Sequence, residues 1–473
     1  MSQFIKKFNH PLTLIIIGAF FLRIINLDYN SPFVDEAIYL QLGRKVLTNT
    51  WAEVGPFMWV GGMPLFYPPL SAIAGFFGGV IGSRLLNVVL GTISVFFLYH
   101  FAKNLRLSEN EGTNEFIALF SSLVFSFMGI PIYLSRLATY DMLSFTLFLG
   151  GHALLFASFN LKKTKDWKLE NRLFLSALLI FLSFLGKYIT LLLYPISIFW
   201  VLLQEKKGKA VRISFSLKYF VFPLISLTGA YIIWAFSDLL SFYNNQVHDI
   251  ENHSLTIIQD FVRYTEPVIF LSGLGILLLI IKKNTTGFFL LFGSFFILLI
   301  HLATNNLDSV HQHVFVSLIF LLPALGFLIS QTMPKKPILQ AVLSAVVLLL
   351  VYKFSYTQAK SLEASWPNTE KVMSFLRKKA DQSSRILSSE GDVSSLALSN
   401  IPYANFNSFW DLDYQGTEGT SAYSKAIADG YFNFILLNNN LTGEIPDIIR
   451  NSSAANYEIV YKTDPFIVYQ LKK

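Results

Sequence analysis

The sequence predicts a polytopic α-helical membrane protein with about eleven transmembrane helices, outer juxtamembrane helices and a C-terminal soluble α/β domain. The first observation is composition: 53% of the 473 residues are hydrophobic and only 14% are charged, whereas a typical soluble protein has about 25% charged residues. The second is a series of apolar segments of about 20 residues, the length that a helix needs to cross a bilayer. The third is that these segments end near Val351.

The predicted membrane domain, residues 1–355, contains these apolar segments in sequence. The N-terminal segment has a basic start like that of a signal peptide but no small-residue cleavage site, so we interpret it as a retained first helix. The predicted spans are residues 10–27, 83–102, 116–134, 141–160, 172–186, 188–204, 217–236, 266–282, 286–303, 314–331 and 336–354.

Segment 65–80 is also apolar, but we interpret it as a juxtamembrane or re-entrant helix on the outer side. Pro68 and Pro69, together with three glycines, make it a poor straight helix. Counting it as a span would also invert the orientation of every later loop.

The basic residues give the predicted orientation. With eleven spans, most loop Lys and Arg residues fall on one side of the membrane, and the positive-inside rule assigns that side to the cytoplasm. The N-terminus is then cytoplasmic, and the loop that contains Asp35 is extracytoplasmic, in the plasma or inner membrane. The residues concerned are Lys6, Lys7, Lys103, Arg106, Lys162, Lys163, Lys165, Lys168, Arg172, Lys206, Lys207, Lys209, Arg212, Lys218, Lys282, Lys283, Lys335 and Lys336.

Residues 360–473 lack long apolar runs and are predicted to form an extracytoplasmic α/β domain. They contain no Gly-rich phosphate loop and no obvious catalytic cluster, so we expect a recognition or capping domain. The predicted elements are helices at 369–379 and 421–429, strands at 385–387 and 431–437, and a terminal hairpin at 457–471.

Charge and cysteine content exclude other classes. The net charge of +7 lies mainly in loops between apolar spans, where it sets orientation, so no nucleic-acid partner is expected. The absence of cysteine excludes disulfides and thiolate metal sites.

Several ionisable residues share the predicted outer face. Asp35 and Glu36 lie in the first outer loop, Arg136 and Asp141 at the second outer turn, and Lys187 at the third. Ionisable residues at the ends of apolar spans are functional candidates because placing them there costs free energy. The structural alternatives are acids that favour the first turn of a helix and basic side chains that reach toward water.

Four histidines of the later outer loops are candidate metal ligands: His248, His253, His311 and His313. With Glu36 or Asp141 they could hold a divalent ion, although their spacing matches no fixed metal motif. Exposed loop histidines without a ligand are the competing interpretation.

These residue types suit sugar transfer from a lipid phosphate. An acceptor hydroxyl needs a general base, for which Asp35 is the candidate. The departing phosphate needs positive charge, which Arg136 and Lys187 would supply.

Five motifs carry a resemblance to a known family: DEAIYL at 35–40, PPL at 68–70, GSRLLNVVLG at 82–91, SRLATYDML at 135–143 and LGKY at 185–188. Their order resembles the GT-C superfamily of membrane glycosyltransferases. The closest branch contains the protein O-mannosyltransferases and the bacterial transferase that adds aminoarabinose to lipid A.

The resemblance implies an inverting transferase that uses a polyprenyl- or dolichyl-phosphate sugar. It implies Asp35 as the base, Asp141 as the second acid and Arg136 as the neighbouring arginine. Tyr67, which we assign to the donor-phosphate site with Arg136 and Lys187, precedes the PPL turn where relatives often have Lys or His. The phosphate site must therefore be partly rebuilt, with Lys187 or the histidines. The expected partners are a lipid-linked sugar donor, membrane lipid and a protein, glycan or lipid acceptor.

Two other classes compete with this interpretation. A transporter or flippase for a lipid-linked substrate would place charges near the bilayer midplane, often in repeated halves. A scaffold protein would explain residues 360–473 but leaves the DEA and SR…D motifs without a role.

Overall fold

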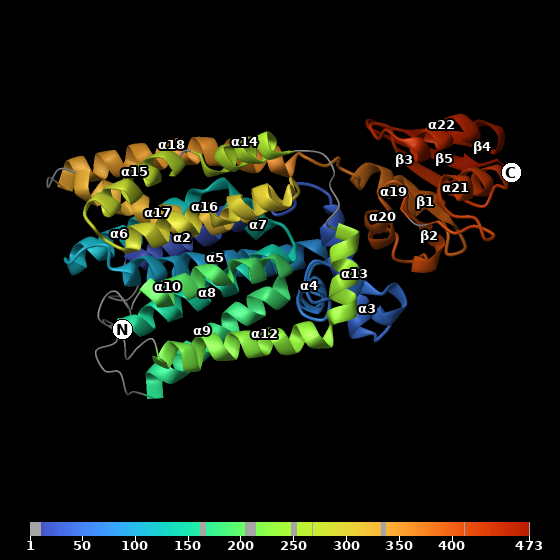
Figure 1. The fold of residues 1–473 in the computed structure, drawn as a ribbon. Coiled ribbons are helices and arrows are strands. Elements are labelled where there is room, and N and C mark those ends of the chain that lie inside the picture. The colour runs from blue at the N-terminus through green and yellow to red at the C-terminus, as the bar shows by residue number, and fades with distance from the viewer. Residues whose placement is uncertain are drawn as a thin grey trace. The chain divides into compact units, whose positions relative to one another are not determined.

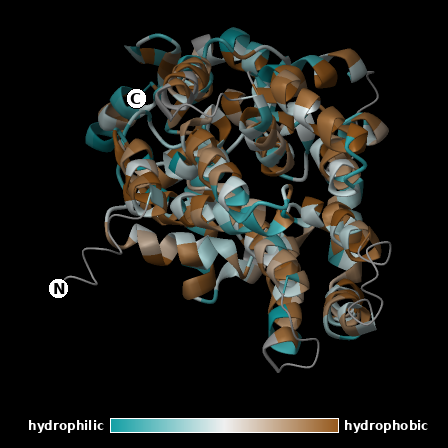
Figure 2. Cartoon of the chain, turned by 90° about the vertical axis from the view of Figure 1, so that its left-hand side faces the viewer, coloured by the Kyte–Doolittle hydropathy of each residue, from teal (hydrophilic) through white to brown (hydrophobic). Residues whose placement is uncertain are grey.

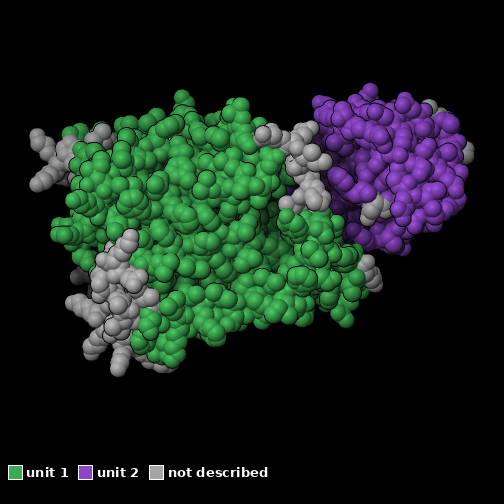
Figure 3. Space-filling view, viewed as in Figure 1, with its two compact units in different colours: residues 1–27, 42–362 green, residues 28–41, 363–473 purple. Residues whose placement is uncertain are grey.

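The computed structural model describes residues 11–160, 167–203, 214–246, 253–266, 268–332, 337–410 and 412–472. The chain divides into two compact units (Figure 3). We call Met1–Leu27 with Leu42–Leu362 the helical unit, and Asp28–Gln41 with Glu363–Lys473 the sheet unit. Many of the basic residues that orient the predicted spans lie outside the described residues, at 1–10, 161–166, 204–213 and 333–336.

Each predicted span coincides with a helix or a consecutive pair of helices, and these run side by side in the helical unit (Figure 1). In chain order they are α2 (Pro11–Ile24), α5 (Val80–Leu105), α6 (Glu111–Phe127) with α7 (Gly129–Arg136), α8 (Tyr140–Phe159), α9 (Trp167–Gly186), η3 (Tyr188–Leu193) with α10 (Tyr194–Leu203), η5 (Leu217–Val221) with α12 (Phe222–Trp234), α15 (Val268–Ile281), α16 (Thr286–Thr304), α17 (Val310–Thr332) and α18 (Pro337–Glu363). The shorter elements are α3 (Val34–Leu47), η1 (Trp51–Val54), η2 (Pro56–Met58), α4 (Tyr67–Gly75), α13 (Phe236–Gln246) and α14 (Ser254–Thr265).

The described residues contain six helices long and apolar enough to cross a membrane, or up to eight if each of two bent pairs is one span. One bent pair is α6 with α7, which meet at 59°. Hydrophobic residues predominate along these helices (Figure 2), as expected where lipid replaces water as the solvent. The protein is therefore an integral membrane protein.

Helix α4 is the element that forms in the apolar segment 65–80. It has nine residues, with Pro68 in its first turn, where the missing N–H breaks no helical hydrogen bond. Nine residues are too few to cross a bilayer, so this segment is not a continuous spanning helix, in agreement with the sequence-based interpretation.

Helices α8 and α17 form the centre of the helical unit. In their apolar parts 83% and 89% of the residues are buried, more than in the other candidate spans. Small residues allow close packing around them: a Cβ atom added to Gly275 of α15 would lie 2.2 Å from the carbonyl oxygen of Ala324 in α17. Such contacts are typical of membrane helices, in which glycine lets backbones approach.

The sheet unit contains a five-stranded sheet of order β2-β1-β3-β5-β4. Strands β2 and β3 are parallel to β1, whereas β5 is antiparallel to both β3 and β4. The predicted terminal hairpin is confirmed, with Tyr457 opposite Leu471. The strands are β1 (Ile386–Ser388), β2 (Phe406–Asn407), β3 (Phe434–Asn438), β4 (Tyr457–Lys462) and β5 (Phe466–Leu471), and the helical segments are α19 (Glu370–Lys379), α20 (Gly391–Ala397), η6 (Tyr403–Asn405), α21 (Gly419–Ala428) and α22 (Glu444–Asn456).

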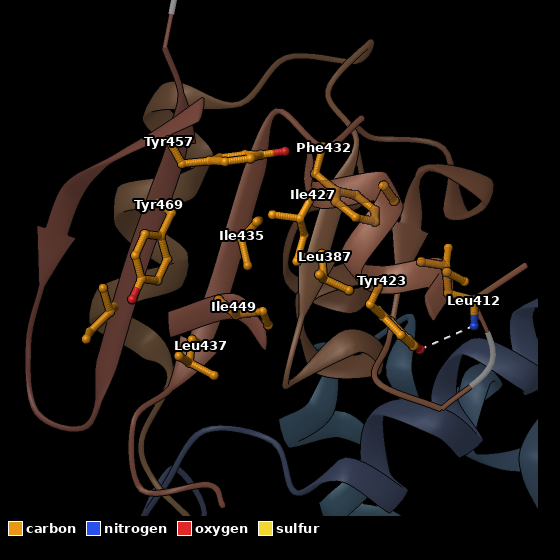
Figure 4. Packing of buried hydrophobic residues seen from close by; sticks show 13 residues of the cluster. Leu387, Leu412, Tyr423, Ile427, Phe432, Ile435, Leu437, Ile449, Tyr457 and Tyr469 are labelled. Atoms are coloured by element: carbon orange, nitrogen blue, oxygen red, sulfur yellow. Dashed lines mark hydrogen bonds between the residues drawn. The ribbon is translucent and has the colours of Figure 1, made fainter. Parts of the chain in front are cut away.

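Both faces of this sheet are covered, which explains why β3 is buried at every position. Successive side chains of a strand point to opposite faces. Ile435 and Leu437 therefore join one core with residues of α21 and α22 (Figure 4). Phe434 and Leu436 join the other core, together with residues of α19 and Ala37 of α3. The first half of α3 is thus part of the sheet unit.

The contact between α15 and α17 generates a stability prediction. Gly275→Ala should lower the apparent melting temperature in detergent, because the added methyl group meets the Ala324 backbone, and overpacking typically costs about 1–3 kcal/mol. The matched control is Gly273→Ala in the same helix, where an added Cβ meets nothing within 4 Å. Heating followed by size-exclusion chromatography measures both; equal melting temperatures would contradict the packing argument.

Candidate functional site

A buried ion pair joins the first turn of α8 to the turn that follows α9 in the helical unit. The Lys187 ammonium contacts Asp141 Oδ1 at 2.5 Å and donates to Gln312 Oε1 at 2.9 Å. The three residues are 6%, 2% and 8% exposed, respectively. The Lys187 Nζ also lies 5.2 Å from the centre of the Tyr140 ring, where an aromatic face attracts a cation. The structure therefore brings together two of the predicted site residues and adds Gln312.

Lys187 is placed by the turn between α9 and η3. Its backbone N–H continues the helical pattern to the Ser183 carbonyl at 2.9 Å. The loop at 61–63 bonds to this turn twice, from Met63 N–H to the Leu185 carbonyl at 2.7 Å and from Tyr188 N–H to the Gly61 carbonyl at 2.8 Å. A Cβ atom at Gly62 would lie 2.2 Å from the Gly186 carbonyl oxygen, so this close approach requires glycine.

Asp141 lies in the first turn of α8, where a carboxylate is favoured by the helix dipole. The Thr139 hydroxyl donates to Asp141 Oδ2 at 2.8 Å. The Asn87 amide holds the preceding loop, donating to the carbonyls of Leu137 at 2.5 Å and Thr139 at 2.7 Å. The Tyr67 hydroxyl in turn donates to Asn87 Oδ1 at 3.3 Å. Tyr67, predicted to bind phosphate, thus contributes to the support of the Asp141 loop.

Arg136 contacts the backbone at the end of α2. Its Nη2 donates to the carbonyls of Ile25 at 2.9 Å and Asn26 at 2.5 Å. Arg84 donates in the same way to the Leu27 carbonyl at 2.7 Å. These carbonyls belong to the turn that follows α2, which ends at Ile24. Buried backbone carbonyls need hydrogen-bond partners, and the two arginines provide them. Arg136 therefore has a structural role beside the predicted phosphate-binding one.

Two histidines form a chain of hydrogen bonds next to the ion pair. His301 Nδ1 lies 2.6 Å from the Asn306 carbonyl oxygen, and His301 Nε2 lies 2.9 Å from His313 Nδ1. A carbonyl can only accept, so in neutral rings both Nδ1 atoms carry hydrogen and His313 Nε2 is an acceptor. This nitrogen is buried and has no hydrogen-bond partner among the described residues.

The predicted metal ligands do not assemble in the described part of the chain. No group of three or more His, Cys, Asp or Glu residues there could hold a metal ion. His311 lies beside the rings of Tyr133 and Tyr264. The backbone N–H of His253 donates to Asn305 Oδ1 at 2.9 Å, and His248 lies outside the described residues.

Asp35 and Glu36 belong to the sheet unit, in the first turn of α3. Glu36 is fully buried, and its Oε2 accepts a hydrogen bond from the Phe33 N–H at 2.9 Å. This is the bond by which an acid in the first turn caps the start of its own helix. Asp35 is only partly buried. Glu36 therefore has a structural role as a cap, and Asp35 is the acid of this pair that solvent can reach.

Sequence reasoning missed Gln312, Asn87, Thr139 and His301. Asn87 is a polar side chain within the predicted span 83–102, and Gln312 lies two residues before the predicted span 314–331. Polar as well as ionisable residues in and beside the spans are therefore a usable signal. Their partners could not be found in this way, because they lie on other helices.

The Lys187 ammonium is the group of this cluster that can bind an anionic ligand. An ammonium has three N–H donors, and the described residues provide two oxygen acceptors, Asp141 and Gln312. A third donor can meet an oxygen of an anionic ligand. A cation that is shielded from water interacts more strongly with such a ligand than one at the surface.

No protein-family model and no curated protein matches the chain. Solved structures do match it. ArnT from Cupriavidus metallidurans in the apo state has a TM-score of 0.70 at 10% identity over 96% of this chain and 97% of that one. The same protein bound to undecaprenyl phosphate has a TM-score of 0.67 at 11% identity over the same shares.

The apo oligosaccharyltransferase of Archaeoglobus fulgidus has a TM-score of 0.62 at 13% identity, over 99% of this chain and 75% of that one. The match extends over nearly all of this chain in each case. The chain thus has the fold shared by ArnT and the archaeal oligosaccharyltransferase, which is the GT-C fold that the sequence motifs predict.

Proposed function

We propose that this protein is a glycosyltransferase that moves a sugar from a polyprenyl-phosphate donor to a hydroxyl acceptor, with inversion at the anomeric carbon. The observation that carries the proposal is the buried Lys187–Asp141 pair, with an ammonium donor left for an anionic oxygen. It occurs in a fold whose solved examples include ArnT bound to undecaprenyl phosphate and the archaeal enzyme with an inhibitory peptide and a dolichol-phosphate.

The proposed reaction is one displacement. The acceptor oxygen attacks the anomeric carbon from the side opposite the phosphate, and the bond from that carbon to the phosphate oxygen breaks. The acceptor proton passes to the Asp35 carboxylate, and the lipid phosphate leaves with the electron pair of the broken bond. A single base is sufficient for this inversion, whereas retaining glycosidases need a second carboxylate as nucleophile.

Lys187 is the proposed ligand of the donor phosphate, where its charge would offset the negative charge that develops on the leaving group. Asp141 orients Lys187 through the buried ion pair. Arg136 and Tyr67 act at this site through the backbone and the loop that they support. Binding of a divalent ion to this protein stays a prediction. The structure of the archaeal oligosaccharyltransferase in complex with Zn and sulfate supports it.

The proposed topology has eleven spans with a cytoplasmic N-terminus. Eleven spans are reached by adding three elements to the eight candidate spans, with each bent pair counted as one. The added elements are the short apolar helix α2, the short apolar pair η3/α10, and α18. Asp35 and residues 363–473 are then extracytoplasmic, where the donor headgroup and the acceptor would meet. Nothing in the fold or the comparisons supports the flippase alternative.

The role of Asp35 is tested by Asp35→Asn in detergent with radiolabelled polyprenyl-phosphate hexoses and pentoses. The amide keeps the shape and removes the base, so donor consumption should fall about 10²–10⁴-fold while donor binding persists. Glu458→Gln, an exposed acid of the same unit, is the control and should leave the rate unchanged. Undiminished consumption by Asp35→Asn would remove Asp35 from the mechanism.

The ion pair predicts separate effects on stability and activity. Lys187→Met should lower the melting temperature, because leaving one charge of a buried pair uncompensated costs about 3–5 kcal/mol. It should also weaken donor binding. The double variant Lys187→Met/Asp141→Leu should recover stability but not donor binding or transfer.

The control for this prediction is Lys103→Met, which breaks a more exposed pair with Glu115 (38% and 28% exposed side chains) and should change stability by at most about 1 kcal/mol. A double variant that regains transfer would show that the pair is structural only.

The absence of native cysteine makes the topology directly testable. Thr48→Cys and Glu109→Cys place single thiols at exposed positions. In intact cells, an impermeant maleimide should label the first from outside and reach the second only after lysis. Labelling of Glu109→Cys in intact cells would reverse the proposed orientation.

A further inference from the structure

The sheet unit has a cleft at the carboxyl ends of β1 and β3, within the unit that carries Asp35. Ser389 and Glu390 follow β1 directly, and the segment that follows β3 continues to Gly443 at the start of α22. Both segments line a cavity of about 400 Å³, within the range of small-ligand sites, roughly 300–1,000 Å³.

The topology explains why a cleft forms there. Strands β2 and β3 lie on opposite sides of β1 and are parallel to it. The connection from β1 to β2 passes through α20, whose Val393 joins one core, whereas that from β2 to β3 passes through α21, whose Ala422 joins the core on the other face. The two connections diverge, and open α/β sheets bind ligands in the crevice at such a switch point.

An aromatic side chain lies open to water at this cleft. Trp410 lines it and is 88% exposed, more than any other large apolar side chain in the described residues. An indole that is so exposed contributes little hydrophobic stabilisation to the fold, but it provides a flat apolar surface for a ligand. Phe409, which precedes it, also lines the cleft.

A carboxylate with unfilled acceptor capacity lies in the same cleft. Among the described residues, Glu390 accepts one long side-chain hydrogen bond, from Asn438 Nδ2 to Oε1 at 3.5 Å. An ionised carboxylate can accept about four. Burial raises the pKa of Glu390. Asn438 is held in place, because its Oδ1 accepts from the Asn440 N–H at 3.1 Å.

The remaining lining residues restrict the ligand class. Glu444 adds a second acid, Thr420 and Thr442 add hydroxyls, and no Lys or Arg lines the cleft in the part of the chain that is described. Two carboxylates disfavour an anionic ligand by like-charge repulsion. A ligand with an apolar face and several hydroxyl donors satisfies the indole and the carboxylates together.

We propose that this cleft binds an uncharged saccharide, with one sugar ring stacked on Trp410 and its hydroxyls donating to Glu390. The saccharide would be the acceptor of the transfer reaction, an assignment that rests on the glycosyltransferase function proposed above. It would make the acceptor a glycan rather than a protein hydroxyl.

The test uses the full-length protein in detergent with a printed array of neutral, amino-sugar and anionic oligosaccharides. Hits are then measured by saturation-transfer NMR and by titration. Neutral oligosaccharides should bind, and Trp410→Ala and Glu390→Gln should each weaken binding at least tenfold. Tyr403→Ala, an exposed aromatic residue of the same unit outside the cleft, is the control and should bind normally. Melting curves verify that each variant is folded.

The outcomes separate this proposal from the proposed function. If no neutral saccharide binds, if anionic glycans bind equally well, or if both cleft variants bind normally, the cleft proposal is overturned, whatever the transfer assay shows. If neutral saccharides bind through Trp410 but no lipid-linked donor is consumed, the cleft stands and the transferase function fails. Binding of amino-sugar oligosaccharides in place of neutral ones would also overturn it.

Discussion

The pairing of Lys187 with Asp141 is the interaction on which the rest of the candidate site depends. Both charges are shielded from water, and neither would be tolerated there without the other, because desolvating an isolated ion costs several kcal/mol. Neighbouring residues hold the two side chains in position for this pairing. Glycines bring the loop at 61–63 against the Lys187 turn, and Asn87 holds the loop ahead of Asp141. The result is a fixed ammonium in a membrane fold, which is what recognition of a lipid phosphate requires.

Buried arginines serve a different purpose in this protein. Arg84 and Arg136 donate to carbonyls of the turn that follows α2, immediately before the Asp28–Gln41 segment. Arg23 contacts the Ser135 hydroxyl at 3.1 Å, and an added Cβ at Gly91 would collide with that hydroxyl. The sequence assigns only Arg136 among these arginines to the donor phosphate, and the hydrogen bonds of Arg136 hold the backbone of the turn after α2.

The sequence-based prediction of the helices was accurate, and the structure brings the predicted site residues Lys187 and Asp141 together in one ion pair. The spans coincide with helices because hydrophobic length is a local property, read directly from neighbouring residues. The SR…D and LGKY motifs contain Asp141 and Lys187. These residues are candidates because placing an ionisable side chain at the end of an apolar span costs free energy. The hydrogen-bond partners of Glu36 and Tyr67 could not be predicted from the sequence. Glu36 accepts a hydrogen bond from Phe33 N–H, and Tyr67 donates one to Asn87, and neither partner can be inferred from residue type.

By itself, the sequence predicted a membrane protein with the GT-C fold, the positions of its helices, and the basic and acidic residues at their ends. Composition, periodicity and short motifs are sufficient for this because each depends on residues close in the chain. Only the tertiary structure decided that Gln312 joins Lys187 across 125 residues, that Asp28–Gln41 packs with the C-terminal sheet, and that a cleft lies at the carboxyl ends of β1 and β3. These features arise from contacts between distant segments, which form only when burial of the apolar helices and strands brings those segments together.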